Sequence, residues 1–493
     1  MQSNLTYLNY IDGTWRDGTA TGQDENRNPA NPSQVLGKST RSSKEDVQKA
    51  IAAAKTAQKT WVRLPRPIRG QYLEKAAAII KTRIDLFAKT MTEEEGKNFN
   101  EARGEVLKTI NVLEFTASEA RRPTGEVIPS EMPNTFLYTT RVPYGVVGII
   151  TPWNFPLCIP AWKIAPALLE GNTVIFKPAT ITPGCAVLLV KAFEEAGLPK
   201  GVLNLVFGSG SVVGNAIVEH PDIHCISFTG SNEVGTRIHE QAAKRLCKTQ
   251  LEMGGKNPLI VCSDADLELA AEATVMGAFG STGQRCTATS RVIVERKVHA
   301  EFTKTLVEKT RTITVGDGMK NPKAMGPVVD EHQYGSVLSF IEEGKRQGLK
   351  LLCGGEKVVT PENGFFIAPT IFDNVPAKSK LAQEEIFGPV LSVIIVDTYE
   401  QALDVANDVA FGLTSSVYTQ DIQRIMQYAD QIETGMLHVN SPTVGGEAQA
   451  PFGGMKATGM GGREMGSTGP EIFCEIKTIY IDYNKTVRQG NLY

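Results

Sequence analysis

The run Val146-Val-Gly-Ile-Ile150 opens a series of short apolar segments, which continues with Thr173-Val-Ile-Phe176, Leu203-Asn-Leu-Val206 and Cys225-Ile-Ser-Phe228. Between the second and third segments, residues 184–196 have a helical pattern that ends at Gly197-Leu-Pro199, a C-terminal glycine followed by a helix-breaking proline. Short buried strands that alternate with helices are typical of crossover units on a parallel sheet. This stretch therefore predicts an α/β fold.

A second series of the same kind follows: Leu259-Ile-Val261, Arg291-Val-Ile-Val-Glu295, Leu391-Ser-Val-Ile-Ile-Val396, Ser416-Val-Tyr418 and Met436-Leu-His-Val439. Helical patterns near residues 266–280, 331–347, 400–409 and 421–431 separate most of these segments. The two series meet at Glu252-Met-Gly-Gly-Lys-Asn-Pro258, where glycines and a proline interrupt the apolar runs. We therefore expect two consecutive α/β domains with their boundary at this segment.

The flanking regions have different patterns. Residues 45–120 carry apolar side chains at helical spacing. In contrast, Phe136-Leu-Tyr-Thr-Thr-Arg-Val142 and Ile476-Lys-Thr-Ile-Tyr-Ile-Asp482 are rich in residues that favour strands. A lone strand with an apolar face needs a partner. We expect these two segments to form a small separate sheet that is used for oligomer contact.

The composition is that of an ordinary globular chain. Its 493 residues are too many for one hydrophobic core, and 41% of them are apolar and 21% charged. The net charge of −3 provides no general attraction to nucleic acid or membranes, and no apolar run approaches the roughly eighteen residues of a membrane helix. The first residues have no export pattern, and the 8 cysteines lack metal-ligand or disulfide-scaffold spacing. We expect a cytoplasmic protein without a metal site.

Two segments of the second half could carry nucleophilic chemistry. Cys286 follows Gly283-Gln-Arg285 in a polar loop, where a thiol can be accessible and a neighbouring cation such as Arg285 can lower its pKa. Glu252 stands beside paired glycines at the expected domain junction, where a buried carboxylate can act as a general base. Taken singly, each has a structural alternative, a buried cysteine and an exposed hinge glutamate.

Three further segments follow predicted strands, at the edge where open α/β sheets bind ligands. Asn154 lies in Pro152-Trp-Asn-Phe-Pro156, where its amide could stabilise an oxyanion or simply belong to a rigid loop. Lys177 ends another strand, and Phe228-Thr-Gly-Ser231 opens a helix whose free N–H groups could receive a phosphate. By contrast, Gly208-Ser-Gly-Ser-Val-Val-Gly214 misses the dinucleotide fingerprint by one residue, and we expect a tight turn.

Together and in this order, the segments resemble the aldehyde dehydrogenase superfamily. That family has W-N-F-P, K-P-A, F-T-G-S, L-E-x-G-G-K, G-Q-x-C and E-E-I-F-G-P, the last of which is Glu384-Glu-Ile-Phe-Gly-Pro389 here. The closing Pro451-Phe-Gly-Gly-Met-Lys456 is also similar, and the resemblance runs from about residue 10 to about residue 482. It implies two Rossmann-like α/β domains, residues 1–123 with 144–254 for NAD(P) binding and 255–468 for catalysis. Residues 124–143 and 469–493 would form the oligomerisation sheet of a homodimer or homotetramer.

The resemblance also implies the roles of individual residues. Cys286 would attack the aldehyde, Asn154 and the Cys286 N–H would hold the oxyanion, and Glu252 would activate the water that hydrolyses the thioester. The nicotinamide cofactor would take the hydride. The cofactor contacts implied are Lys177 and Thr180 near the adenosine ribose, Ser231 at the pyrophosphate, and Glu385 with Phe387 at the nicotinamide ribose. Trp153 and Gly230 are further implied contacts of the cofactor.

One departure concerns the cofactor. Many NAD-preferring members carry a glutamate three residues after the lysine of K-P-A, where it repels a 2′-phosphate. Thr180 stands at that position here. Because the like-charge repulsion is absent, we expect NADP to be used at least as well as NAD.

Arg285, which precedes Cys286 in the sequence, bears on the identity of the substrate. Its guanidinium could bind a distal carboxylate of the substrate, or it could form a structural ion pair away from the substrate. Within the family, the chain most resembles enzymes that oxidise α-ketoglutaric semialdehyde (2,5-dioxopentanoate). We therefore expect oxidation of a small carboxylated semialdehyde, with broad aliphatic and aromatic aldehyde oxidation as the alternative.

Three rival functions fit the residues present less well. A binding protein on the same fold would not need Cys286, Glu252 and Asn154 together, and an acylating dehydrogenase typically lacks the glutamate. An enzyme for phosphorylated aldehydes would need a basic cluster at the tunnel mouth. Only Arg121-Arg122 and Arg285 are candidates for such a cluster.

Overall fold

The structure, a computed structural model, describes residues 5–485, and its first α/β unit is built on an eight-stranded sheet. The strand order is β22-β12-β11-β8-β9-β10-β2-β3. Its parallel centre consists of β12 (Lys248–Glu252), β11 (Ile223–Thr229), β8 (Val146–Ile150), β9 (Thr173–Lys177) and β10 (Leu203–Leu205). The antiparallel additions at its edges are β22 (Gly459–Met460), β2 (Asn9–Ile11) and β3 (Thr14–Arg16). The expected strands of the first series are confirmed.

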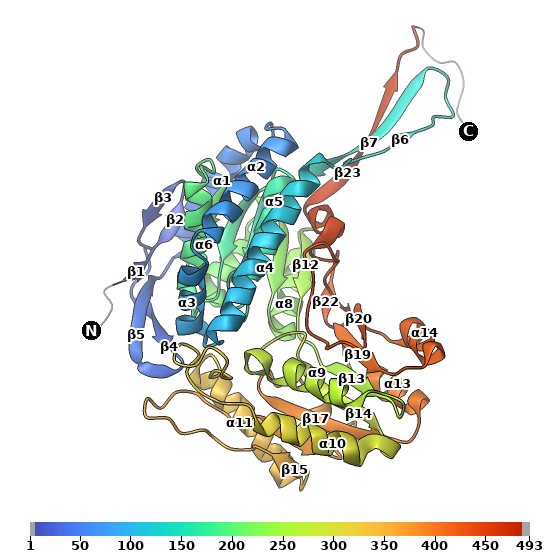
Figure 1. Cartoon of the computed structure of the whole chain (residues 1–493). Helices are drawn as coiled ribbons and strands as arrows, with labels where there is room; N and C mark the ends of the chain where they lie inside the picture. Colours follow the sequence, from blue (N-terminus) through green and yellow to red (C-terminus); the bar gives the residue numbers. More distant parts are fainter. Residues whose placement is uncertain (1–4, 486–493) are drawn as a thin grey trace.

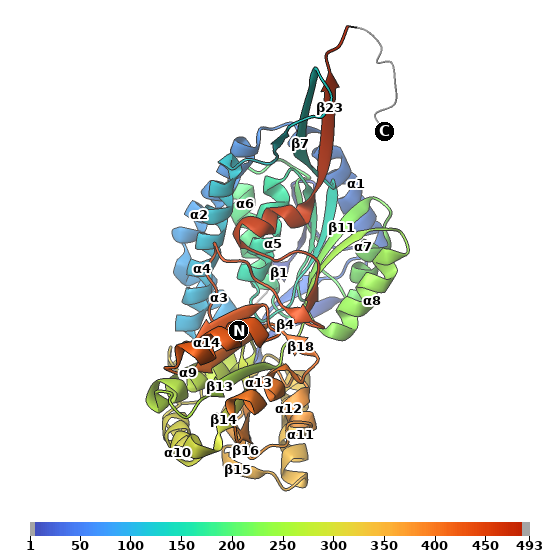
Figure 2. The same cartoon turned by 90° about the vertical axis from the view of Figure 1, so that its right-hand side faces the viewer.

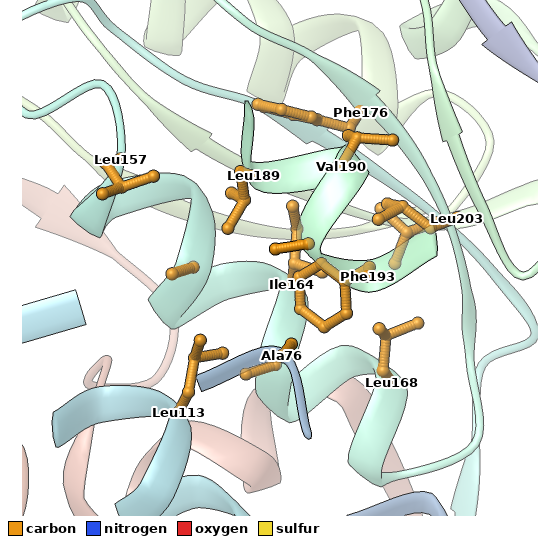
Figure 3. Packing of buried hydrophobic residues seen from close by; sticks show 14 of the residues in the cluster. Ala76, Leu113, Leu157, Ile164, Leu168, Phe176, Leu189, Val190, Phe193 and Leu203 are labelled. Carbon is orange, nitrogen blue, oxygen red and sulfur yellow. The ribbon is translucent and has the colours of Figure 1, made fainter. Parts of the chain in front are cut away.

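Helices cover both faces of this sheet, because successive side chains of each buried strand point to opposite sides. On β9, Val174 and Phe176 pack in one apolar cluster and Ile175 in the other. The first face is covered by α2 (Arg66–Lys81), α3 (Ile84–Glu95), α4 (Phe99–Ser118), α5 (Cys158–Leu169) and α6 (Pro183–Glu195). The second is covered by α1 (Lys44–Trp61), α7 (Asn215–Glu219) and α8 (Asn232–Ala243). Figure 3 shows Phe176 with Ile164, Leu189 and Phe193 inside the first cluster.

The second unit has a seven-stranded sheet of order β15-β16-β17-β14-β13-β19-β20 (Figure 1). The strands are β13 (Asn257–Val261), β14 (Thr289–Glu295), β15 (Lys350–Cys353), β16 (Thr370–Asp373), β17 (Val390–Val396), β19 (Thr414–Tyr418) and β20 (Met436–Val439), and β15 alone is antiparallel in this described sheet. The helices are α9 (Leu267–Phe279), α10 (Arg296–Arg311), α11 (Glu331–Arg346), α12 (Lys380–Gln383), α13 (Tyr399–Asn407) and α14 (Ile422–Gln431). A two-stranded ribbon joins β18 (Phe411–Gly412) to β21 (Met455–Lys456).

A small sheet projects from the first unit, as both whole-molecule views show (Figures 1 and 2). It pairs β7 (Thr135–Pro143) with β23 (Cys474–Asp482) over their full lengths, and β6 (Val127–Ile128) adds to the other edge of β7. The prediction that the two β-rich segments form a separate sheet is confirmed. Among residues 5–485, no helix is both long and apolar enough to span a bilayer.

Two features differ from the expectations. Residues 5–40, for which we predicted no strands, form β2 and β3 and a second sheet of β1 (Thr6–Tyr7), β4 (Gln23–Asn28) and β5 (Asn31–Thr40). The tight turn expected at 208–214 is wrong, because Gly210–Gly214 forms a helical turn that continues into α7. Ser209 caps this turn by accepting the Val212 N–H at 3.2 Å.

Candidate active site

A cavity of about 280 Å³ between the two units gathers most of the predicted site residues. It is lined by Trp153, Asn154, Gly230, Ser231, Cys286, Glu385 and Phe387 among others. A second cavity, of about 700 Å³, also contacts Trp153 and contains Lys177 and Thr180. Glu252 lines neither cavity, and Arg285 lines a separate small one. The loops after β8, β9 and β11 therefore meet the cysteine loop at one edge of the first sheet.

The loop before Cys286 adopts an unusual backbone conformation that presents the thiol. Ser281, Thr282 and Gly283 all have positive φ, at 49°, 60° and 70°. A Cβ on Gly283 would lie 2.2 Å from the Gly388 carbonyl oxygen, so only glycine fits there. After the cysteine, Asn257 Nδ2 donates to the Cys286 carbonyl oxygen at 2.7 Å. Cys286 is thus held from both sides on a rigid segment.

The electrostatic environment of Cys286 differs from the one we predicted. The pKa of the Cys286 thiol is raised to about 12, chiefly by burial and then by the charges of Glu252 and Glu385. We expected Arg285 to lower this pKa, and that expectation is wrong. The Arg285 guanidinium instead donates to Ser281 Oγ at 3.0 Å and pairs with Glu101 at 3.3 Å. This ion pair corresponds to the structural alternative for Arg285.

Asn154 is held by a buried network that the sequence did not reveal. Its Nδ2 donates to the Gln284 carbonyl oxygen at 3.1 Å, which leaves the second amide hydrogen for a ligand. The backbone carbonyl oxygen of Asn154 accepts from Lys97 Nζ at 2.6 Å, and Lys97 also pairs with Glu105 at 2.7 Å. In the described chain, no acceptor takes the Cys286 N–H. This pair of free donors suits an oxyanion.

Glu252 ends β12, where it lies opposite Thr229 of β11 and Gly459 of β22. Burial raises its pKa well above the ordinary value, and the charge of Glu464 adds to the effect. Its Oε2 has no hydrogen-bond partner among residues 5–485, and a Cβ on Gly453 would lie 2.6 Å from Oε1. The charge of Glu252 also raises the pKa of the Cys286 thiol. A buried, unpartnered carboxylate in this position suits a general base.

The other side of the cavity is formed by the segment around Glu385. Its carboxylate accepts the Gly255 N–H at 2.9 Å, and burial raises its pKa to about 7. A Cβ on Gly254 would lie 2.5 Å from Glu385 Oε2, which explains the paired glycines after Glu252. Phe387 has a φ of 55° and contacts the Trp153 ring edge-to-face at 5.4 Å between centres.

The larger cavity has the chemistry of a dinucleotide groove. Burial lowers the pKa of Lys177 to about 8, and its Nζ donates only to the Pro178 carbonyl oxygen, at 3.0 Å. Arg41, which the sequence did not single out, lines the same cavity and donates to Asp24 at 2.8 Å. Ser231 caps α8 and lines the smaller cavity, so the segment Phe228-Thr-Gly-Ser231 opens a helix, as predicted. These donors fit the ribose and phosphate groups of a nicotinamide dinucleotide.

Comparison with known proteins identifies the family. The family model described as "Aldehyde dehydrogenase family" matches residues 15–479. The α-ketoglutaric semialdehyde dehydrogenase of Bacillus subtilis is 48% identical over 97% of this chain and 98% of its own length. Among solved structures, the betaine aldehyde dehydrogenase of Staphylococcus aureus in complex with NAD+ has a TM-score of 0.95 and 34% identity, over 98% of this chain and 96% of the other. An NADP-dependent enzyme of Escherichia coli has a TM-score of 0.94 and 34% identity, over 97% of this chain and 98% of the other. The chain is thus an enzyme of the aldehyde dehydrogenase family.

Proposed function

We propose that this enzyme oxidises a small carboxylated semialdehyde to its acid, with NAD or NADP as the hydride acceptor. The observation that carries the proposal is the convergence of Cys286, Asn154 and Glu385 in one cavity that adjoins the Lys177 groove. The name of the Bacillus relative supports α-ketoglutaric semialdehyde as the substrate. We further assign cofactor binding to residues 1–123 and 144–254 and catalysis to residues 255–468.

The reaction follows from the residues of the cavity. Glu252 accepts the proton of the Cys286 thiol and passes it to solvent, and the sulfur bonds to the aldehyde carbon to give the oxyanion of a thiohemiacetal. The oxyanion is held by the Asn154 amide and the Cys286 N–H, and losing such a donor typically costs about 100- to 1000-fold in rate. Bound nicotinamide would supply the acceptor for the hydride that leaves this carbon. Glu252 then takes a proton from water, whose oxygen displaces the sulfur of the resulting thioester and releases the acid.

Both cofactors are proposed because Thr180 places no carboxylate at that position and Lys177 lines the groove without an acidic partner among the described residues. Arg41, which pairs with Asp24, and Asp330 also line this groove. A 2′-phosphate would gain from the charge of Lys177. We expect kcat/KM with NADP to be at least equal to that with NAD, and a value below about one-tenth would contradict the proposal. Thr180→Glu should shift preference toward NAD by like-charge repulsion, whereas Thr180→Gln, its uncharged match, should not.

We also propose a homodimer or homotetramer assembled through the projecting sheet. Its large apolar side chains are exposed, among them Val127 (71%), Ile476 (74%) and Tyr480 (62%). A second copy of the chain would cover this face and extend the sheet. Light scattering of Ile476→Lys should show smaller particles than the wild type, and an unchanged mass would contradict this assembly. A cytoplasmic location remains a prediction.

The test of the activity is the initial rate of NADH and NADPH formation with α-ketoglutaric semialdehyde, succinic semialdehyde and hexanal. The wild type should favour the two acids, and Cys286→Ala should abolish reduction with all three. A preference for hexanal would replace the proposed substrate class with broad aldehyde oxidation. Activity retained in Cys286→Ala would overturn the assigned nucleophile.

A further inference from the structure

A single lysine of α4 lies at the apolar wall of the active site. The Lys108 ammonium is 5.4 Å from the centre of the Trp162 ring of α5, and a Cβ on Gly446 would lie 3.5 Å from its Nζ. Trp162 in turn packs on Phe452, with 5.2 Å between ring centres. Lys108 is half-buried, so its ammonium is neither free in solvent nor enclosed. It sits where α4, α5 and the segment 446–452 meet.

This apolar wall leads directly to the nucleophile. Cys286 and Phe155 pack against a cluster formed by Val112, Cys158, Ile159, Trp162, Leu413, Phe452 and Met465. Ile159 belongs to this cluster and also lines the cavity that contains Cys286. Val112 stands four residues after Lys108 on α4, and side chains at that spacing share a helix face. A short aldehyde bound at Cys286 would therefore extend along apolar side chains toward an ammonium group.

The charge of Lys108 is not neutralised by a protein carboxylate. Within residues 5–485, Lys108 has no ion pair or hydrogen bond. The nearest acid on α4, Glu105, is committed to Lys97 and to two backbone N–H groups of the loop before α5. Glu447, beside Gly446, accepts instead from the Gln449 amide. An unpaired cation at the edge of an apolar pocket is available to an anionic ligand.

The field at the site makes such a cation necessary for an acidic substrate. Burial is the main cause of the raised Cys286 pKa, and the charges of Glu252 and Glu385 act in the same direction. These two carboxylates would repel a substrate carboxylate. Lys108 acts on Cys286 with the opposite sign. Arg285 cannot replace it, because its guanidinium is engaged by Glu101.

We propose that Lys108 binds the substrate carboxylate and selects carboxylated aldehydes over neutral ones. The proposal rests on the proposed function, since it names the residue that recognises the proposed substrate class. A charge-assisted hydrogen bond from Nζ to the carboxylate would position the short chain with its aldehyde carbon at Cys286. A neutral aldehyde would make no such bond and would gain nothing from Lys108.

The experiment compares Lys108→Met with the wild type on α-ketoglutaric semialdehyde and on hexanal. Removing a hydrogen bond to a charged group should raise KM for the acid by about 10-fold or more, with kcat within about 2-fold. KM for hexanal should stay the same or fall, and Lys108→Arg should keep most of the acid preference. A KM rise that is equal for both aldehydes, or no rise, would overturn the proposal.

Two controls separate this effect from a general one. Lys75→Met removes another lysine placed over an aromatic ring, 5.7 Å from the centre of Tyr72, on the exposed side of α2, and should change neither KM. Arg285→Met removes the alternative cation and should affect both aldehydes alike. If Arg285→Met instead discriminates between the aldehydes and Lys108→Met does not, the anchor is Arg285 and the proposal is wrong.

A second measurement tests whether Lys108 is the carboxylate-binding residue, or anchor, even if the proposed substrate is wrong. The acid product, α-ketoglutarate, should inhibit hexanal oxidation competitively in the wild type, and its Ki should rise about 10-fold in Lys108→Met. This result would support the anchor even for an enzyme that does not favour the semialdehyde, in which case only the proposed function fails. A Ki that is equal in the two enzymes would overturn the anchor and leave the proposed function standing.

Discussion

Replacing Lys97 with methionine should destabilise the fold and loosen Asn154, the proposed oxyanion donor. The buried Lys97 ammonium binds both the Glu105 carboxylate and the Asn154 backbone carbonyl oxygen. Lys97 is 1% exposed, and its Nζ donates to the Glu105 carboxylate at 2.7 Å and to the Asn154 carbonyl oxygen at 2.6 Å. The same ammonium lies 4.0 Å from the centre of the Phe155 ring. Methionine keeps most of the length of the side chain and removes all of these interactions.

The expected magnitude follows from what remains unpaired. Breaking a buried ion pair by removing one partner costs about 3–5 kcal/mol, because the remaining charge stays buried. Glu105 keeps part of its stabilisation, since its other oxygen still accepts the N–H groups of Leu157 and Cys158 at 3.0 Å each. We therefore expect a loss near about 3 kcal/mol of unfolding free energy. The Asn154 amide is still present but less firmly held, so kcat should fall by about 10-fold, less than when an oxyanion donor is deleted.

The assay is the apparent unfolding temperature at one fixed scan rate, together with kcat at saturating aldehyde. The decisive comparison is the double variant Lys97→Met/Glu105→Gln, which also removes the buried charge that lies closest to the lost ammonium. The other acid near this ammonium is Glu95, at 3.9 Å, and burial raises its pKa to about 8. The double variant should be more stable than Lys97→Met alone. The reasoning is refuted if the two losses add, so that the double variant is less stable, or if Lys97→Met unfolds at the wild-type temperature.

Three further predictions test the geometry and the electrostatics of the site and of the fold around it. Gly283→Ala should abolish turnover, because a Cβ there would meet the Gly388 carbonyl oxygen at 2.2 Å, and a near-normal kcat would contradict the assigned loop strain. Glu252→Gln should lower turnover but quicken the alkylation of Cys286 by iodoacetamide at alkaline pH, because the substitution removes a charge that raises the thiol pKa. Slower alkylation would contradict this interpretation. Burial raises the pKa of Glu94 from 4.5 to about 7, so the folded state keeps a proton that the unfolded state loses, and stability should decline as pH rises through this range. Denaturant titration of Glu94→Gln should show a flatter decline, and an unchanged pH dependence would rule out this carboxyl as its cause.

The parallel sheets were predictable because their strands are buried on both faces. Such strands are continuous apolar runs, as Val146–Ile150 shows, and the helices between them have a clear period. The strands of residues 5–40 lack this signal. β4 is Gln23-Asp-Glu-Asn-Arg-Asn28, a polar segment that joins a sheet through its pairing with β5 and not through its own apolar side chains. Strand propensity alone does not identify a segment of this kind.

Some residues of the candidate site could likewise be predicted from the sequence, and others could not. Cys286 and Asn154 were singled out because each lies in a loop with a distinctive local pattern, whereas Glu385 was named only through the family resemblance. Lys97 lies in the loop before α4 and Lys108 lies within α4, and neither segment has a distinctive pattern. Tertiary contacts alone bring them to the site, Lys97 to the Asn154 backbone and Lys108 to Trp162 of α5. No spacing rule connects such residues to a loop far along the chain.

Arg285 shows the converse error. Its place beside Cys286 suggested that it lowers the thiol pKa, yet adjacency along a chain does not fix where a long side chain ends. Its guanidinium pairs with Glu101, which lies 184 residues away in sequence. The cation that does act favourably on the thiol is Lys108, from the same helix as Glu101. Helix α4 thus pairs with Arg285 through Glu101 and contributes Lys108, the cation that lowers the thiol pKa.

The electrostatics of the site also bear on the proposed roles of Cys286 as nucleophile and Glu252 as base. Burial raises the pKa of both Cys286 and Glu252, so a second negative charge in this place is costly. A proton that passes from the thiol to the carboxylate leaves the number of charges unchanged. Once the sulfur is bonded in a thioester it carries no charge, and the carboxylate can ionise again to activate water. Glu252→Gln should therefore lower turnover and quicken alkylation. The same carboxylate raises the thiol pKa and, in the proposed mechanism, activates the water that hydrolyses the thioester.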